Sequence, residues 1–184
     1  MKEKIEELKK IYKYLQDLEI RFKTISHPKV ISCEESKKYY DLKGMDESKY
    51  SLCKNILIRD KKGKNFWLVI LDFTKKLDLE MLRDYIGSSK LGLATIEDLD
   101  RLLKSKPGSV SLFSLFNDND KKIKIIFDQD LIEKEFLAFH PNYNGLTSFI
   151  TWRETIRFLF NQGYSFSVLK MGENVKESVL VKKI

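Results

Sequence analysis

The sequence predicts a single α+β (mixed α/β) domain over residues 1–184, with a mixed β-sheet flanked by helices. Segments with the apolar period of helices are interspersed with β-rich runs, which indicates that both kinds of structure share one core. Several neighbouring β-rich runs are separated only by turns and form hairpins, so the sheet cannot be purely parallel. A chain of 184 residues is long enough for one ordinary domain and short for two.

The first half of the chain begins with a predicted amphipathic helix at about residues 2–18. Its apolar residues recur at three- and four-residue spacing: Ile5, Leu8, Ile11, Leu15 and Leu18. The alternating segment "IRFKTIS" predicts a strand, and "SCEE" predicts a capping box of Ser32 and Glu35 that opens a helix ending at Gly44. The runs "LCKNILI" and "NFWLVILDF" predict a hairpin with Gly63 in its loop.

The second half continues the same alternation. The segment "LDLEMLRDYI" predicts a helix ending before Gly87, and "TIEDLDRLLKS" predicts another that begins with a box of Thr95 and Asp98. After the loop "KPGSVSLFSLFND" come a strand "KKIKIIFD", a short helical piece "DQDLIEKE", and strands "FLAFH" and "LTSFI" around the turn "PNYNG". A helix capped by Thr151 and Glu154, a strand "YSFSVLK" and a charged tail from about residue 171 complete the prediction.

Charge favours a polyanionic partner. The chain has 34 Lys and Arg residues against 27 Asp and Glu residues, for a formal net charge of +7. Such a surplus suits nucleic acid or an anionic membrane surface. The lysine runs "DKKGK", "DKKIK" and "VKKI" are solvated faces or guides for a nucleic-acid backbone.

Metal, disulfide and membrane functions are not indicated. The two cysteines, Cys33 and Cys53, lack the paired spacing of a zinc site or a disulfide framework. The longest uninterrupted apolar run, at residues 66–71, is far below the roughly 20 residues that span a bilayer. We therefore expect a cytoplasmic protein with no metal and no organic cofactor.

No nucleophile elbow, Walker A, HExxH or GxGxxG motif is present. Three local clusters stand out instead: "CKN" at 53–55, "GSVSLF" at 108–113 and "HPN" at 140–142. In the order "KN…RDKKGK…LVIL…GSVS…D…FHPN" they resemble the YbaK/ProX family of free-standing aminoacyl-tRNA deacylases, which is similar to the editing domain inserted in bacterial prolyl-tRNA synthetases. The resemblance runs from about residue 25 to 169, and "HPN" makes it closest to the ProX-like branch.

The resemblance implies a mixed, curved sheet and hydrolysis of the ester between a wrong amino acid and the terminal adenosine of prolyl tRNA. Lys54 would contact the terminal phosphate or ribose, and Gly108 would open a loop whose amides face the ester carbonyl. His140 would line the pocket as a base or only as a wall. The remaining predicted substrate contacts are Asn55, Ser109, Val110, Ser111 and Asn142.

One departure from the family pattern concerns the loop that Gly108 opens. The family usually has a proline where this chain has Leu112, and often a second glycine where it has Ser114. Because proline fixes φ and glycine permits close approach, these changes bear on the shape of the loop and the amino acid admitted.

The chemistry needs neither a metal nor a catalytic triad. Ester hydrolysis requires a water molecule, a proton acceptor and donors for the developing oxyanion, and the 2′-hydroxyl of the nucleotide lies beside the ester. Alanine is the favoured mischarged residue, with cysteine, serine and threonine as the other candidates. Prolyl-tRNA synthetase is a further candidate partner. The alternatives are a non-catalytic tRNA or nucleotide binding module of the same fold and, third, a protein-interaction domain.

Without the resemblance, two of these residues have simpler interpretations. Lys54 would be a strand-end lysine whose head group reaches water. His140 would be a histidine hydrogen-bonded at the end of a strand. The ordered series of motifs is what favours a site.

Overall fold

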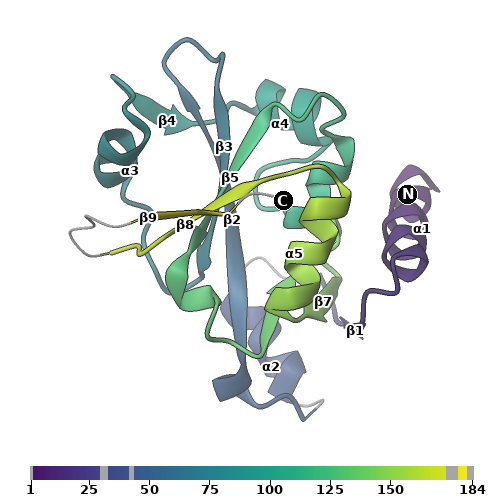
Figure 1. Cartoon of the computed structure of the whole chain (residues 1–184). Helices are drawn as coiled ribbons and strands as arrows, with labels where there is room; N and C mark the ends of the chain where they lie inside the picture. The colour runs from purple at the N-terminus through teal and green to yellow at the C-terminus, as the bar shows by residue number, and fades with distance from the viewer. Residues whose placement is uncertain (1, 30–32, 42–43, 173–177, 182–184) are drawn as a thin grey trace.

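A mixed β-sheet forms the centre of the computed structural model, which describes residues 2–29, 33–41, 44–172 and 178–181 (Figure 1). Its main path has the order β1-β7-β6-β2-β3-β5-β8-β9, with β4 paired to β2 beside it. The strands are β1 (Phe22–Ser26), β2 (Tyr50–Asp60), β3 (Phe66–Asp72), β4 (Leu91–Leu93), β5 (Ile123–Asp128), β6 (Phe136–Phe139), β7 (Leu146–Ile150), β8 (Phe166–Leu169) and β9 (Ser178–Val181). The pairs β2–β6, β3–β5 and β5–β8 are parallel and the other pairs are antiparallel, so the predicted mixed sheet is confirmed.

Helices cover both faces of this sheet. They are α1 (Lys2–Asp17), α2 (Cys33–Asp41), α3 (Leu79–Ile86), α4 (Ile96–Leu103) and α5 (Trp152–Asn161), with short 3-10 turns η1 (Glu47–Lys49), η2 (Leu112–Asn117) and η3 (Gln129–Leu131). Figure 1 shows α1, α4 and α5 on one side of β2, β3 and β5, and α3 on the other. No helix in the described stretches combines the length and the apolar character that crossing a membrane requires.

The alternation of β3 divides the core between the two faces. Phe66, Leu68 and Ile70 belong to the large cluster under α4 and α5, whereas Trp67 and Val69 belong to the smaller cluster under α3. Successive strand residues point to opposite faces, so a strand that is covered on both faces is apolar throughout. This explains why "FWLVIL" is an unbroken apolar run.

Most local start and stop signals are confirmed. Thr95 and Asp98 form the complete capping box at the start of α4, and the Thr151 hydroxyl accepts from the Glu154 amide at the start of α5. Gly87 ends α3 with a φ of 71°. The predicted capping box of Ser32 lies outside the described residues.

The structure contains two short strands that the sequence did not predict. The short strand β4 was not expected, and residues 178–181 of the predicted charged tail form β9 against β8. The predicted short helical piece after β5 is present as the 3-10 helix η3, which is only three residues long. Strands this short form because a neighbouring edge supplies their hydrogen bonds, which a local pattern does not reveal.

Candidate active site

Strand β2 has an open segment along one edge. On that edge, residues 50–52 pair with β6 and residues 58–60 pair with β4. No described strand pairs with residues 53–57 on this edge, although the Leu57 carbonyl accepts from the amide of Ala94, just after β4. Because backbone groups at a strand edge that no other strand covers can bond to a molecule that fits there, the part of the gap at Asn55 is a potential binding position.

The polar groups of this open edge belong to Cys53 and Asn55. The Leu52 carbonyl accepts a hydrogen bond on the side of β3, whereas the Leu57 carbonyl accepts one on the opposite edge of β2. Backbone groups of successive strand residues point to alternate edges. The backbone groups of Cys53 and Asn55 therefore point to the same edge as the Leu57 carbonyl, into the gap. Asn55 Nδ2 donates to the Cys53 carbonyl at 3.0 Å, while the buried Asn55 Oδ1 has no hydrogen-bond partner in the described part of the chain. A buried amide oxygen without a donor is costly, so a donor from a ligand would stabilise this position.

Lys54 lies between these two residues in the sequence and points to the other face of β2, the face of Ile56 and Ile58. Its half-buried Nζ donates to the carbonyl of Lys75 at 2.7 Å. Among the described residues no carboxylate lies within ion-pair distance of it. An ammonium has three donors, so two of them remain available to an anionic or ester oxygen.

The loop that Gly108 opens presents two amides for binding. Gly108 is exposed with a φ of +76°, a conformation that glycine adopts without strain. The Ser109 amide donates to a carbonyl of the preceding turn at 2.9 Å, and the Ser111 amide donates to a serine hydroxyl at 3.1 Å. The amides of Gly108 and Val110 have no acceptor among the described residues, so these two are the candidate oxyanion donors.

The two positions where this loop departs from the family pattern have structural roles. Leu112 is fully buried in the large core cluster. Ser114 forms a capping box with Ser111 and donates from Oγ to Asn142 Oδ1 at 2.7 Å. In this chain, the burial of Leu112 and the hydrogen bonds of Ser114 therefore hold the loop at the two positions where the family usually has proline and glycine.

His140 presents a neutral proton acceptor. Its Nδ1 lies 2.8 Å from the carbonyl of Leu146, which can only accept, so Nδ1 carries the proton and Nε2 keeps its lone pair. Burial lowers the pKa of His140 below its usual value, and the nearby His27 also lowers it, against the opposing effect of the hydrogen bond to Leu146. The imidazole is therefore uncharged at neutral pH and can accept a hydrogen bond.

A small cavity of about 10 Å³ lies beside His140, lined in part by Tyr40, Cys53, Ala138 and Thr147. The Tyr40 hydroxyl lies 2.7 Å from Thr147 Oγ1, which in turn lies 3.0 Å from His27 Nε2. This volume is close to the smallest that holds a single water molecule. The cavity can thus take a group no larger than about a methyl group without rearrangement.

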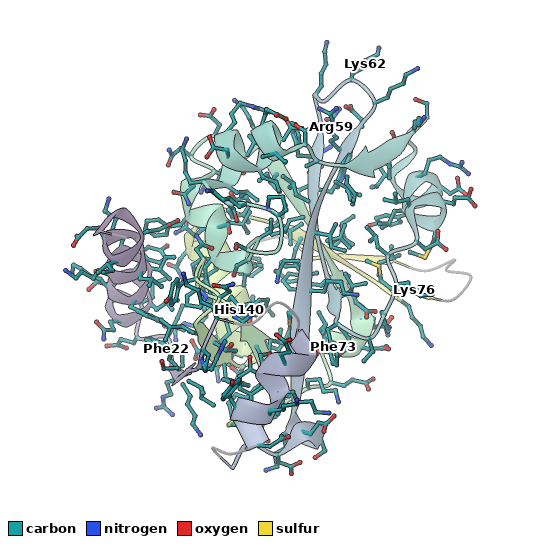
Figure 2. The ribbon with its side chains drawn as sticks, turned by 180° about the vertical axis from the view of Figure 1, so that it is seen from behind. Phe22, Arg59, Lys62, Phe73, Lys76 and His140 are labelled. Carbon is teal, nitrogen blue, oxygen red and sulfur yellow. The ribbon has the colours of Figure 1, made fainter. Side chains whose placement is uncertain are left out.

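The structure joins some of the predicted site residues and separates others. Ser114 links Ser111 to Asn142, and the side chains of Asn55 and Val110 share the face of β2 that carries the large core cluster. Lys54 lies on the opposite face, where its Nζ donates to the segment that follows β3. In Figure 2, His140 and Phe73 lie away from the hairpin end, where Arg59 and Lys62 are found.

Sequence reasoning missed two groups of residues here. Tyr40 and Thr147 line the cavity but come from α2 and β7, which are more than 100 residues apart, and neither lies in a motif. Glu7 of α1 accepts hydrogen bonds from Asn142 and Asn117. In the sequence, Glu7 is one of several charged residues of the first helix, so no local pattern sets it apart from the solvated ones. Among the described residues, no cluster of three or more His, Cys, Asp or Glu side chains could hold a metal ion.

The chain belongs to the aminoacyl-tRNA editing domain family, because the model of that family matches residues 27–158. It is 32% identical over 157 residues to the prolyl-tRNA editing protein ProX of Acetoanaerobium sticklandii, a match that covers 85% of this chain and 93% of that protein. It is also 29% identical over 165 residues to prolyl-tRNA synthetase associated domain-containing protein 1 of Bos taurus, covering 87% and 92% of the two chains. The family resemblance inferred from the motifs is confirmed.

A crystal structure of a candidate trans-editing enzyme for prolyl tRNA synthetase has the same fold. The two structures align with a TM-score of 0.68 at 18% identity, over 90% of this chain and 98% of the other. At this identity the likeness concerns the fold alone. The predicted α+β fold with a mixed sheet is therefore confirmed.

Proposed function

We propose that the protein is a trans-editing deacylase that hydrolyses mischarged prolyl tRNA. The observation that carries this proposal is the pair of neighbouring β2 side chains at its open segment: among the described residues, the buried Asn55 Oδ1 has no donor and, on the opposite face, the Lys54 ammonium has no carboxylate. A terminal aminoacyl-adenosine offers both, since its free 2′-hydroxyl can donate and its phosphate is anionic. The relative named as a prolyl-tRNA editing protein supports the same substrate.

In the proposed reaction, water attacks the ester carbonyl carbon, the acyl–oxygen bond breaks, and a proton passes to the departing 3′-oxygen. The amides of Gly108 and Val110 are placed as donors to the developing oxyanion, each worth on the order of 3 kcal/mol. His140 Nε2 and the 2′-hydroxyl of the substrate are the available acceptors that orient the water. Positioning supplies most of the catalysis in this proposal.

The cavity beside His140 is the proposed site for the amino-acid side chain. Its volume of about 10 Å³ suits the methyl group of alanine and excludes the pyrrolidine ring of proline without rearrangement. A difference of one methylene group gives only weak discrimination when an amino acid is selected for charging. A pocket that rejects the cognate residue by size adds a second selection step after charging. Alanine is therefore the proposed target, ahead of serine, cysteine and threonine.

The direct test is incubation of the purified protein with prolyl tRNA charged with alanine, cysteine, serine, threonine or proline, with and without prolyl-tRNA synthetase. We expect release of alanine and retention of proline. A salt-sensitive complex that releases nothing would identify the alternative, a non-catalytic binding module. If neither release nor binding occurs, the tRNA proposal is wrong.

A lysine-rich edge at the far end of the sheet is the proposed contact for the body of the tRNA. It consists of the hairpin lysines Lys61, Lys62 and Lys64 and of Lys121, Lys122 and Lys124 at the start of β5 and just before it, all exposed. The parallel register of β3 and β5 sets the two groups side by side. Along β2, this edge lies about 20 Å from Lys54, beyond the reach of the terminal nucleotide itself.

Replacing Lys61, Lys62 and Lys64 by Gln should weaken tRNA binding and make it less dependent on salt. Each lost phosphate contact reduces the slope of log K against log salt by about 0.7 to 0.9, so three contacts give a change of about two. The measurement is a binding titration of tRNA at several salt concentrations.

The matched control replaces three lysines of α1, Lys9, Lys10 and Lys13, which gives the same change in net charge. An equal loss of slope in both variants would mean that net charge alone governs binding. Hydrolysis of a short aminoacyl nucleoside should be unchanged in the hairpin variant.

A further inference from the structure

We propose that Glu7 of α1 is a positioning residue that fixes the loop opened by Gly108 and the "HPN" turn in their working arrangement. The proposal rests on the function proposed above. It assigns a role in the site to a helix that precedes residues 27–158, the segment matched by the family model. The helix is then a component of the editing site rather than an appendage.

Three hydrogen bonds in series connect Glu7 to the loop. Glu7 Oε1 accepts from Asn142 Nδ2 at 2.8 Å, and Asn142 Oδ1 accepts from Ser114 Oγ at 2.7 Å. Ser114 Oγ accepts from the amide of Ser111 at 3.1 Å. Asn142 and Ser114 are both buried, so this path lies inside the protein.

A second amide meets the same carboxylate oxygen. Asn117 Nδ2, at the end of η2, donates to Glu7 Oε1 at 3.0 Å and also to the carbonyl of Leu103 at 3.1 Å. Glu7 thus contacts η2 and the turn that follows β6. No lysine or arginine forms an ion pair with Glu7 among the described residues, so the carboxylate is held by amides.

The carboxylate determines which way the Asn142 amide faces. An ionised carboxylate only accepts hydrogen bonds, so it requires the NH₂ group of Asn142 on its side and leaves Oδ1 for Ser114. A flipped Asn142 would set its oxygen against the carboxylate. Asn142 also has a φ of +56°, so its backbone already occupies the left-handed region that asparagine tolerates better than most residues. Glu7 therefore selects one of two arrangements of this buried side chain.

Docking of α1 does not depend on Glu7. Ile11 and Leu15 of the helix are fully buried in the large core cluster, and Tyr14 makes edge-on ring contacts with Phe116 and Phe158. Loss of one carboxylate leaves these apolar contacts in place. A Glu7 variant should therefore stay folded, and its effect on the site can be measured.

The first test compares Glu7→Ala and Glu7→Gln with Glu6→Ala, a control on the neighbouring exposed residue of the same helix. In Glu7→Ala we expect kcat for deacylation to fall about tenfold with little change in KM, because two hydrogen bonds to a charged group are lost away from the substrate. Glu7→Gln should regain part of the activity, since its carbonyl oxygen can still accept. Unchanged kcat in folded Glu7→Ala would overturn the proposal.

A second measurement is independent of activity and separates this proposal from the proposed function. In nitrogen-15 NMR spectra, the side-chain amide signals of Asn142 and Asn117 and the backbone amide of Ser111 should move in Glu7→Ala and stay in place in Glu6→Ala. If the wild-type protein releases no amino acid but these signals move, the function is wrong and the positioning role stands. If the Ser111 signal does not move, the connection from α1 to the loop is refuted.

Discussion

Replacing Lys54 by Ala should abolish deacylation of mischarged prolyl tRNA while the fold survives. The Lys54 ammonium has two donors left after its bond to the Lys75 carbonyl and no carboxylate partner in the described structure. Loss of such a preorganised charge should lower kcat/KM by at least about 100-fold. Single-turnover hydrolysis of alanyl prolyl tRNA provides the measurement.

The control for this prediction is Lys76→Ala, a change of the same kind at an exposed lysine on the segment after β3 (Figure 2). Lys54→Arg adds a second comparison, because it keeps the charge but replaces a compact ammonium by a planar fork. Lys54→Arg should restore the binding of the substrate more fully than the rate of its hydrolysis. Full activity in Lys54→Ala would remove Lys54 from the proposed site.

Replacing Lys75 by Met should produce the largest loss of stability. Lys75 Nζ lies 2.8 Å from Asp128 Oδ2 and 2.6 Å from Asp130 Oδ2, and the Asp128 side chain is completely buried. Burial disfavours the charge of Lys75, yet its hydrogen bonds to both aspartates raise its pKa above the usual value. Without the lysine, a buried carboxylate is left without its cation, which costs about 3 kcal/mol or more.

Urea denaturation of Lys75→Met measures this loss, with Lys76→Met as the exposed control that should unfold like the wild type. Adding Asp128→Asn to Lys75→Met should recover much of the stability, since the buried charge is then gone. A single variant as stable as the wild type would show that the pair contributes no net stability.

Local patterns predicted the parts of the fold that depend on near neighbours. The capping box of Thr95 and Asp98, the end of α3 at Gly87 and the hairpin of β2 and β3 all follow from residues close together in the sequence. Helix caps and hairpins are decided by local hydrogen bonds and turn residues, so the sequence reveals them. Strands β4 and β9 depend on edges formed by distant segments, so local patterns did not predict them.

The candidate site divides in the same way. The sequence by itself determined the family, through "CKN", "GSVS" and "HPN", and with it the residues most worth testing. Only the tertiary structure decided that β2 has an open edge, that Lys54 and Val110 lie on opposite faces of the sheet, and that α1 reaches Asn142 through Glu7. The physical reason is that hydrogen-bond partners and unpaired groups are properties of which segments meet, and segments more than 100 residues apart meet only when the whole sheet has formed.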